Sequence, residues 1–208
     1  MMNALNHAAF SPLTAAADTP ERRGEERQRT CFAIGRLVHA GREHVCLVRN
    51  MSESGVGIEL DSPPPVGTDV TIETRALSPC RARVMWTDGR RAGLRLDGHH
   101  AQEAARDHRP RSPRFAFARE LELIVEDRLC TVRSTDLSLG GIGLAAHVVA
   151  GVETPVVLLL GQHTLLGRLC WHAGGASGVR FTRPLTGTEL NELLSWQHAR
   201  APDERERP

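Results

Sequence analysis

The chain has 208 residues, a formal net charge of +1, 40% hydrophobic residues and 4% aromatic residues. This length suits one large domain or two small ones, and no run of about 18 apolar residues is present to cross a bilayer. The low net charge and the few aromatic rings argue against a nucleic-acid binder, because single strands are held by basic grooves and stacking rings. We therefore expect a soluble protein with no membrane span and no nucleic-acid partner.

The cysteines and the short motifs narrow the class further. The five cysteines are odd in number and include no CxxC pair, which argues against a disulfide framework or a structural zinc site. The N-terminus lacks a basic region ahead of its weakly apolar stretch, so it does not resemble a secretory signal. No GxSxG, GxxxxGK[ST] or HExxH motif occurs. These observations predict a cytoplasmic protein that is not an enzyme and holds no metal or cofactor.

The first half of the chain predicts an all-β domain. Residues 1–20 are expected to be a flexible tail, 21–98 the domain, and 99–110 a polar linker in which prolines break any helix. Within the domain, a charged run at 21–29 precedes short runs rich in β-formers, separated by turn residues such as those of "DSPPPVGT". The predicted strands cover residues 30–38, 44–50, 55–60, 69–75, 80–86 and 92–96.

The second half predicts the same order of strands and then a helix. Thr186 and Glu189 form a capping box ahead of the amphipathic run 190–197, so a C-terminal helix is expected there. We expect residues 111–198 to form this second domain and 199–208 to be a flexible tail. Its predicted strands cover residues 115–125, 129–135, 141–146, 155–160, 165–171 and 177–181.

Landmark residues recur between the halves at nearly constant distances. Arg27 precedes Arg114 by 87 residues, Asn50 precedes Asp136 by 86, and Trp86 precedes Trp171 by 85. Such agreement across different motifs indicates a tandem duplication, and each copy has enough strands to close a small barrel. We therefore predict an all-β fold of two small six-stranded barrels in tandem with a C-terminal helix.

Two motifs in the first copy carry a family resemblance. "RRGEER" places Arg23 and Arg27 in an RxxxR spacing, and "NMSESG" places Asn50, Ser52 and Gly55 in a [D/N]xSxxG pattern. With the later "W......GLRL" and "W......GVRF", they resemble the PilZ domain, a six-stranded β-barrel that binds the bacterial second messenger cyclic di-GMP. The resemblance implies that both halves are PilZ-like and that the RxxxR segment, loose when free, wraps the bound ligand.

The chemistry of these residue types suits a guanine nucleotide. Guanine O6 and N7 are paired acceptors that one guanidinium can meet bidentately, and a second Arg can clamp a phosphate or stack on a base. Asn50 is placed for the guanine N1 and N2 donors, Ser52 for a phosphate or for orienting the loop, and Gly55 for a turn beside the ligand. The resemblance also implies that Arg22, just before the RxxxR, favours a stacked pair of ligand molecules.

The second copy carries a degenerate form of the site. Pro110 stands where the first Arg of RxxxR is expected, although Arg109 and Arg111 lie close by and "DLSLGG" is intact. A misplaced guanidinium loses bidentate geometry, so a degenerate partner domain is the simpler interpretation. The candidate residues of this second site are Arg114, Asp136, Ser138 and Gly141.

Each motif also has a purely structural interpretation. Arg22, Arg23, Arg27 and Arg29 alone would fit a solvated charge run paired with nearby glutamates, and the Ser and Gly residues could serve only the turns. Trp86 and Trp171 are expected to cap the core rather than to stack on bases.

The agreement of the two motifs favours nucleotide binding. The leading prediction is a cyclic di-GMP effector that changes conformation on binding and signals to an unidentified downstream protein in motility, biofilm or surface behaviour. The alternative is a nucleotide-free PilZ-like interaction module. A homodimer is compatible with either prediction.

Overall fold

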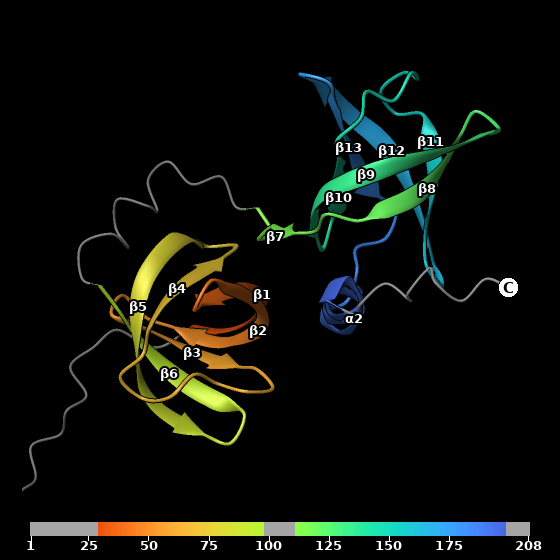
Figure 1. Cartoon of the computed structure of the whole chain (residues 1–208). Coiled ribbons are helices and arrows are strands. Elements are labelled where there is room, and N and C mark those ends of the chain that lie inside the picture. The colour runs from red at the N-terminus through yellow and green to blue at the C-terminus, as the bar shows by residue number, and fades with distance from the viewer. Residues whose placement is uncertain (1–28, 98–110, 199–208) are drawn as a thin grey trace, which may run out of the picture.

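Two antiparallel β-barrels follow one another along the chain, and a helix follows the second barrel (Figure 1). The computed structural model describes residues 29–97 and 111–198. The predicted all-β tandem fold with a C-terminal helix is confirmed within these residues. The segments expected to be tails and linker lie largely outside them.

The first barrel closes in the strand order β1-β2-β3-β6-β5-β4. Alternation explains the closure: on β5, Ala82 and Val84 are buried whereas Arg81 and Arg83 are exposed, so one face of each strand is apolar and turns inward. Cys46 lies in this core, and burial raises the pKa of its thiol to about 12. The strands are β1 (Arg29–His39), β2 (Arg42–Met51), β3 (Gly55–Glu59), β4 (Asp69–Thr74), β5 (Leu77–Asp88) and β6 (Arg91–Leu96).

The second barrel repeats this topology, and a β9–β10 pairing closes it. Each of the strands β9 to β13 has one counterpart in the first barrel that begins 85 or 86 residues earlier, whereas β7 and β8 together correspond to β1. For example, β3 begins at Gly55 and β10 at Gly141, a difference of 86, and β6 begins at Arg91 and β13 at Ala176, a difference of 85. The strands are β7 (Phe115–Ala116), β8 (Glu120–Val125), β9 (Arg128–Ser138), β10 (Gly141–Leu144), β11 (Pro155–Leu160), β12 (His163–Ala173) and β13 (Ala176–Phe181).

The predicted single strand 115–125 is wrong in one respect, because it is broken into β7 and β8. The buried hydroxyl of Ser134 donates to the Phe117 carbonyl at 2.7 Å and accepts from the Arg119 N–H at 3.0 Å. These bonds hold the segment between β7 and β8 in an irregular conformation, in which the Phe117 side chain is completely buried. The first barrel has only a register shift between Thr30 and Ala33 at the equivalent place.

The helix α2 (Gly187–His198) begins at the predicted capping box. The Glu189 N–H donates to Thr186 Oγ1 at 3.2 Å, and the Thr186 N–H donates to the Glu189 carboxylate at 2.7 Å. Leu190 and Leu193 are fully buried in the core of the second barrel, so packing of one helix face holds α2 in place. No helix in the described part of the chain is long and apolar enough to cross a membrane.

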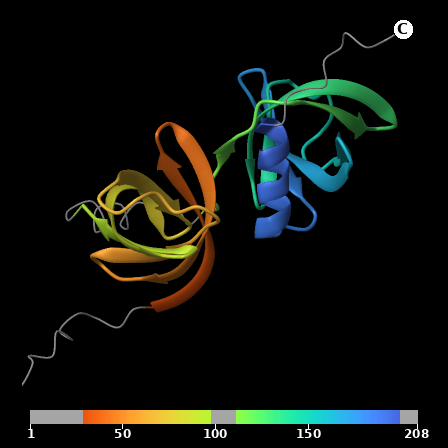
Figure 2. The same ribbon diagram turned by 60° about the horizontal axis from the view of Figure 1, so that its bottom comes forward.

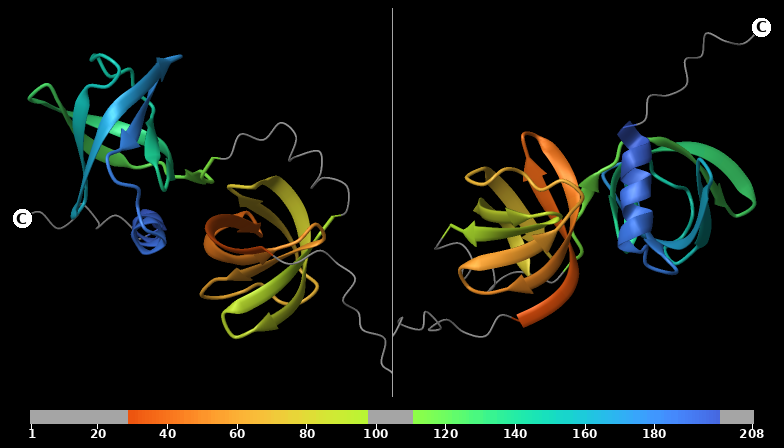
Figure 3. Two further views of the ribbon diagram at one scale, coloured as in Figure 1. Left: turned by 180° about the vertical axis from the view of Figure 1, so that it is seen from behind. Right: turned by 90° about the horizontal axis from the view of Figure 1, so that it is seen from below.

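The two barrels touch through β1, β2, β7 and α2. The Ala116 N–H donates to Glu43 Oε2 at 2.7 Å, and Glu43 is itself held by Arg36 at 2.6 Å. Ile34 and Val45 of the first barrel pack against the apolar core of the second. Figures 2 and 3 show α2 on the side of the second barrel that faces the first, with β7 between the two. The contact therefore combines a polar clamp with a small apolar patch.

Truncating the cap should destabilise the second barrel. Thr186→Ala removes the acceptor of the Glu189 N–H, and loss of such a cap costs about 1 kcal/mol. Urea unfolding followed by circular dichroism should show this loss. Thr182→Ala, which truncates an exposed threonine just before the helix, is the matched control and should change the free energy of unfolding much less.

The same cap predicts a dependence of stability on pH. The pKa of Glu189 is lowered from its ordinary value of 4.5 to about 2, first because Arg183 donates to its carboxylate and then because the Thr186 N–H does. Folding thus favours the charged carboxylate, so the stabilisation is complete above pH 4.5 and is lost as pH falls towards about 2. Thermal unfolding of wild type and Glu189→Gln should differ at neutral pH and converge near pH 2. A difference that is constant with pH would contradict this assignment.

Candidate functional site

The turn between β2 and β3 is closed by the serine of the NxSxxG motif. The Ser52 N–H donates to the Gly55 carbonyl at 2.9 Å, and the Gly55 N–H donates to Ser52 Oγ at 3.1 Å. Of the two roles predicted for Ser52, the geometry supports orienting the loop. A Cβ on Gly55 would lie 2.9 Å from the Leu94 carbonyl oxygen, so this glycine permits close approach of β3 and β6.

Asn50 lies on the outer face of the barrel and extends over β3. Its register partner is Gly57, and a Cβ at Gly57 would lie 2.4 Å from Asn50 Oδ1. The amide therefore occupies the space that a side chain on β3 would otherwise fill. Gly57 was not predicted as a site residue, although the "GVG" after the motif is a sequence signal for it.

Trp86 lies on the same outer face, over Gly93 of the neighbouring strand. The two are register partners next to a bulge, and a Cβ at Gly93 would lie 2.0 Å from Trp86 Nε1. Trp86 is 50% exposed and its counterpart Trp171 is 39% exposed. The prediction that these tryptophans cap the core is therefore wrong: a bulge turns each of them outward.

Asn50, Gly57, Gly93 and Trp86 stand in one cross-strand line over β2, β3, β6 and β5, which we call the outer row. Neighbouring strands are about 4.8 Å apart, so the outer row spans about 14 Å. Both glycines lack side chains, so the Asn50 amide covers Gly57 and the Trp86 indole covers Gly93. The outer row thus presents an amide and an indole, lying over neighbouring strands, to a planar ring.

Arg95 adds a positive charge beside the outer row. It is exposed on β6, two residues after Gly93, and is the register partner of Gly55. Among the described residues it makes no ion pair. A guanidinium that lies beside the amide and the indole and has no carboxylate partner among the described residues is suited to a phosphate.

The second barrel carries an equivalent row. Asp136, Gly143, Gly178 and Trp171 are register partners over β9, β10, β13 and β12. A Cβ at Gly143 would lie 2.5 Å from Asp136 Oδ2, and one at Gly178 would lie 1.9 Å from Trp171 Nε1. The duplication therefore preserved the outer row as well as the strands.

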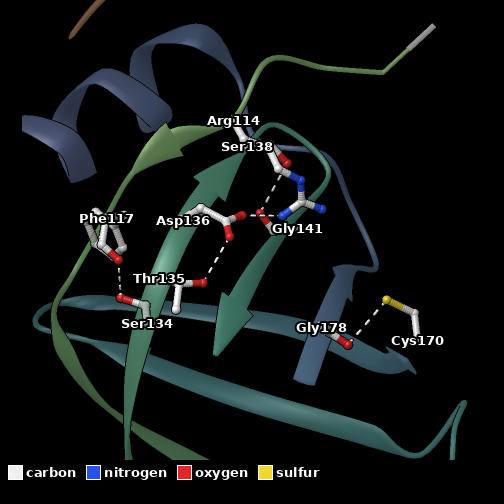
Figure 4. Close-up of polar contacts among 9 residues, drawn as sticks. All are labelled: Arg114, Phe117, Ser134, Thr135, Asp136, Ser138, Gly141, Cys170 and Gly178. Carbon is white, nitrogen blue, oxygen red and sulfur yellow. Dashed lines mark hydrogen bonds and ion pairs between the residues drawn. The ribbon is translucent and has the colours of Figure 1, made fainter. Parts of the chain in front are cut away.

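The charges of the second row are neutralised within the barrel. Arg114 forms an ion pair with Asp136, whose other carboxylate oxygen accepts from Thr135 Oγ1 at 2.9 Å (Figure 4). Arg180, which occupies the place of Arg95, pairs with Glu153 at 3.2 Å. A ligand on this row would have to displace contacts that the protein already makes.

The predicted site residues divide into three groups. Arg22, Arg23 and Arg27 lie outside the described residues. Ser52 and Gly55 shape the turn, as do Ser138 and Gly141, where Ser138 Oγ donates to the Gly141 carbonyl at 3.2 Å. The residues whose side chains reach the rows are Asn50 in the first copy and Arg114 with Asp136 in the second.

The fold and the outer row define a tandem of small six-stranded antiparallel barrels, the first with an amide and an exposed indole on its outer wall. The PilZ domain family model matches residues 21–108, a range that includes both the RxxxR and the NxSxxG motifs. This part of the chain is therefore similar to a PilZ domain. No curated protein matches the chain.

Solved structures with a similar fold are distant in sequence. PlzA of Borreliella burgdorferi in complex with c-di-GMP is 8% identical, with 82% of this chain and 87% of that chain covered and a TM-score of 0.36. The PilZ domain of CeSA from a cellulose-synthesizing bacterium is 21% identical, over 42% of this chain and 100% of that one, with a TM-score of 0.33. The K. pneumonia MrkH–c-di-GMP complex is 11% identical, over 79% and 84%, with a TM-score of 0.32.

The contact between each indole and its glycine can be tested directly. Gly93→Ala should displace Trp86, and Gly178→Ala should displace Trp171, because the new methyl would overlap the indole nitrogen. Each variant should shift a different indole N–H signal in a ¹⁵N-labelled NMR spectrum and leave the other in place. Gly140→Ala, where no atom lies within 4 Å of the new methyl, is the control and should shift neither. One shared response to both variants would rule out two separate contacts.

Proposed function

We propose that the first barrel is a receptor for cyclic di-GMP and that the chain is an effector rather than an enzyme. The observation that carries the proposal is the outer row beside the NxSxxG turn, within the segment that matches the PilZ domain model. In this proposal one guanine lies against the Asn50 amide and the Trp86 indole, which cover Gly57 and Gly93. The arginines of the RxxxR segment close over the ligand from the N-terminal side.

The ends of the outer row suit the two recognition tasks that a guanine presents. The Asn50 carbonyl can accept from guanine N1–H and N2–H, as an Asn amide offers one acceptor oxygen. The indole of Trp86, half exposed, provides an aromatic wall against which a base can stack, an interaction worth about 1 to 3 kcal/mol per base. Trp86 therefore joins the predicted ligand-binding residues.

Unpaired charge supports binding by the first barrel. Cyclic di-GMP carries two phosphates, and Arg95 has no carboxylate partner in the described part of the chain. Arg23 and Arg27 of the matched segment supply the further guanidinium groups that bidentate recognition of guanine or phosphate requires.

We propose that the second barrel does not hold the nucleotide and supports the first. Its Asp136 is held by Arg114 and its Arg180 by Glu153, so ligand binding would have to break two ion pairs. Pro110 also replaces the first Arg of the motif. The contacts of Arg114, Ser138 and Gly141 suit a structural role.

Strand β2 is the element through which binding would reach the second barrel. Asn50 near one end of β2 belongs to the outer row, while Glu43 and Val45 near the other end contact the second barrel. A ligand that binds one arrangement of β2 more tightly shifts the population of that arrangement. The altered interface would then be presented to a downstream protein.

Calorimetric titration of cyclic di-GMP into matched variants tests the proposal. Wild type should bind with a Kd of about 1 µM or tighter, and Arg27→Ala should abolish binding. Asn50→Ala should weaken binding at least about 10-fold, since a lost contact of about 1.4 kcal/mol has that effect. The equivalent change in the second barrel, Asp136→Ala, is the control and should leave the affinity unchanged.

Further titrants separate the competing functions. Cyclic di-AMP should not bind, because adenine lacks the guanine O6, and a generic DNA duplex should not bind at physiological salt. Failure of wild type to bind cyclic di-GMP would favour the nucleotide-free interaction module. The same titration gives the stoichiometry: two ligand molecules per chain would support the role proposed for Arg22, and one would remove it.

A further inference from the structure

The outer walls of the two barrels carry hollows at equivalent positions, and their linings differ in chemistry. The hollow on the first barrel, about 460 Å³, is lined by Arg81, Thr71 and Arg83 among others. The hollow on the second barrel, about 450 Å³, has Leu166, Val157 and Arg168 at the corresponding positions of the duplication. Arg83 corresponds to an arginine of the second barrel, Arg168. In contrast, Arg81 and Thr71 correspond to the apolar residues Leu166 and Val157.

The apolar character of this part of the second barrel extends across four strands. Leu129, Ile124, Val157 and Leu166 are consecutive register partners on β9, β8, β11 and β12, and we call them the apolar row. At the corresponding positions of the first barrel, the consecutive register partners are Glu43, Val38, Thr71 and Arg81. Leu129 is 61% exposed and Leu166 is 57% exposed, so both ends of the apolar row face outward.

The fold does not require this apolar row, because the first barrel closes in the same topology with charged residues at its ends. Exposed apolar surface is unfavourable by about 25 cal/mol per Å², and large outward-facing patches of it mark interaction sites. The neighbouring charges then indicate what covers the row.

We propose that the apolar row is the contact between two copies of this chain. Arg168 borders the hollow from β12, and Glu126 and Asp127 border it from the β8–β9 turn, on the opposite side. None of these three side chains is in an ion pair within the described residues.

This arrangement of charges is self-complementary. In a two-fold dimer the apolar row of one copy packs against the apolar row of the other copy. If the two-fold axis is parallel to the strands, β12 of one copy lies opposite the β8–β9 side of the other. Leu166 of one copy then meets Leu129 of the second copy. Arg168 meets the acidic turn of the second copy, and both contacts occur twice.

Sedimentation equilibrium of the full chain tests the dimer without reference to the nucleotide. The test variant combines Leu129→Glu with Leu166→Arg, which gives the second barrel the residues that the first barrel carries at these positions. Wild type should dimerise, and the variant should raise the dissociation constant at least about 10-fold while its circular dichroism stays unchanged. Val66→Thr, at an exposed valine of the first barrel, is the matched control and should dimerise like wild type.

A charge exchange tests the orientation of the two copies. Arg168→Glu and Glu126→Arg should each weaken the dimer, and the double variant should recover it, because the exchanged charges again meet across the axis. A wild type that is monomeric at about 1 mM, or a dimer that the leucine variant leaves intact, would overturn the proposal. Absence of recovery in the double variant would overturn the two-fold arrangement. Because the test contains no nucleotide, its outcome is separate from that of the proposed cyclic di-GMP function.

Discussion

The register in which β2, β3, β6 and β5 pair is the constraint on which the proposed site depends. It sets two glycines side by side between Asn50 and Trp86, so the amide and the indole can extend over the neighbouring backbone. A one-residue slip would turn these side chains into the core. Barrel closure fixes the register from both sides, so the positions of the amide and the indole are a consequence of the fold rather than of a loop.

The two barrels show how a duplicated scaffold can diverge without a change of topology. Both keep the outer row, yet Asp136 and Arg180 of the second barrel are held by internal partners, whereas Arg95 of the first has none among the described residues. The adjoining wall also differs between the barrels: the second barrel carries the apolar row there, whereas the first barrel has charged residues at the ends of the corresponding row. Charge pairing on one face and apolar exposure on another are consistent with a first barrel that binds a ligand and a second that makes protein contacts.

Much of this architecture could be predicted from local patterns. Alternating apolar and polar residues and the turn residues located the strands apart from the division of 115–125, and the Thr186–Glu189 capping box located the helix. The break between β7 and β8 could not be predicted, because it depends on the Ser134 hydroxyl from another strand. The outward position of Trp86 was also missed, since a bulge reverses the side that alternation assigns to it.

The sequence by itself determined the duplication, the order of elements, the NxSxxG turn and the similarity of the first half to a PilZ domain, because each depends on residues close in sequence or on spacing. Only the tertiary structure decided which residues share a surface. Gly57 and Gly93 lie 36 positions apart in the sequence and become neighbours through the pairing of β3 with β6. Arg114 and Asp136 neutralise one another for the same reason: side chains distant in sequence meet only when strands from different parts of the chain close the barrel.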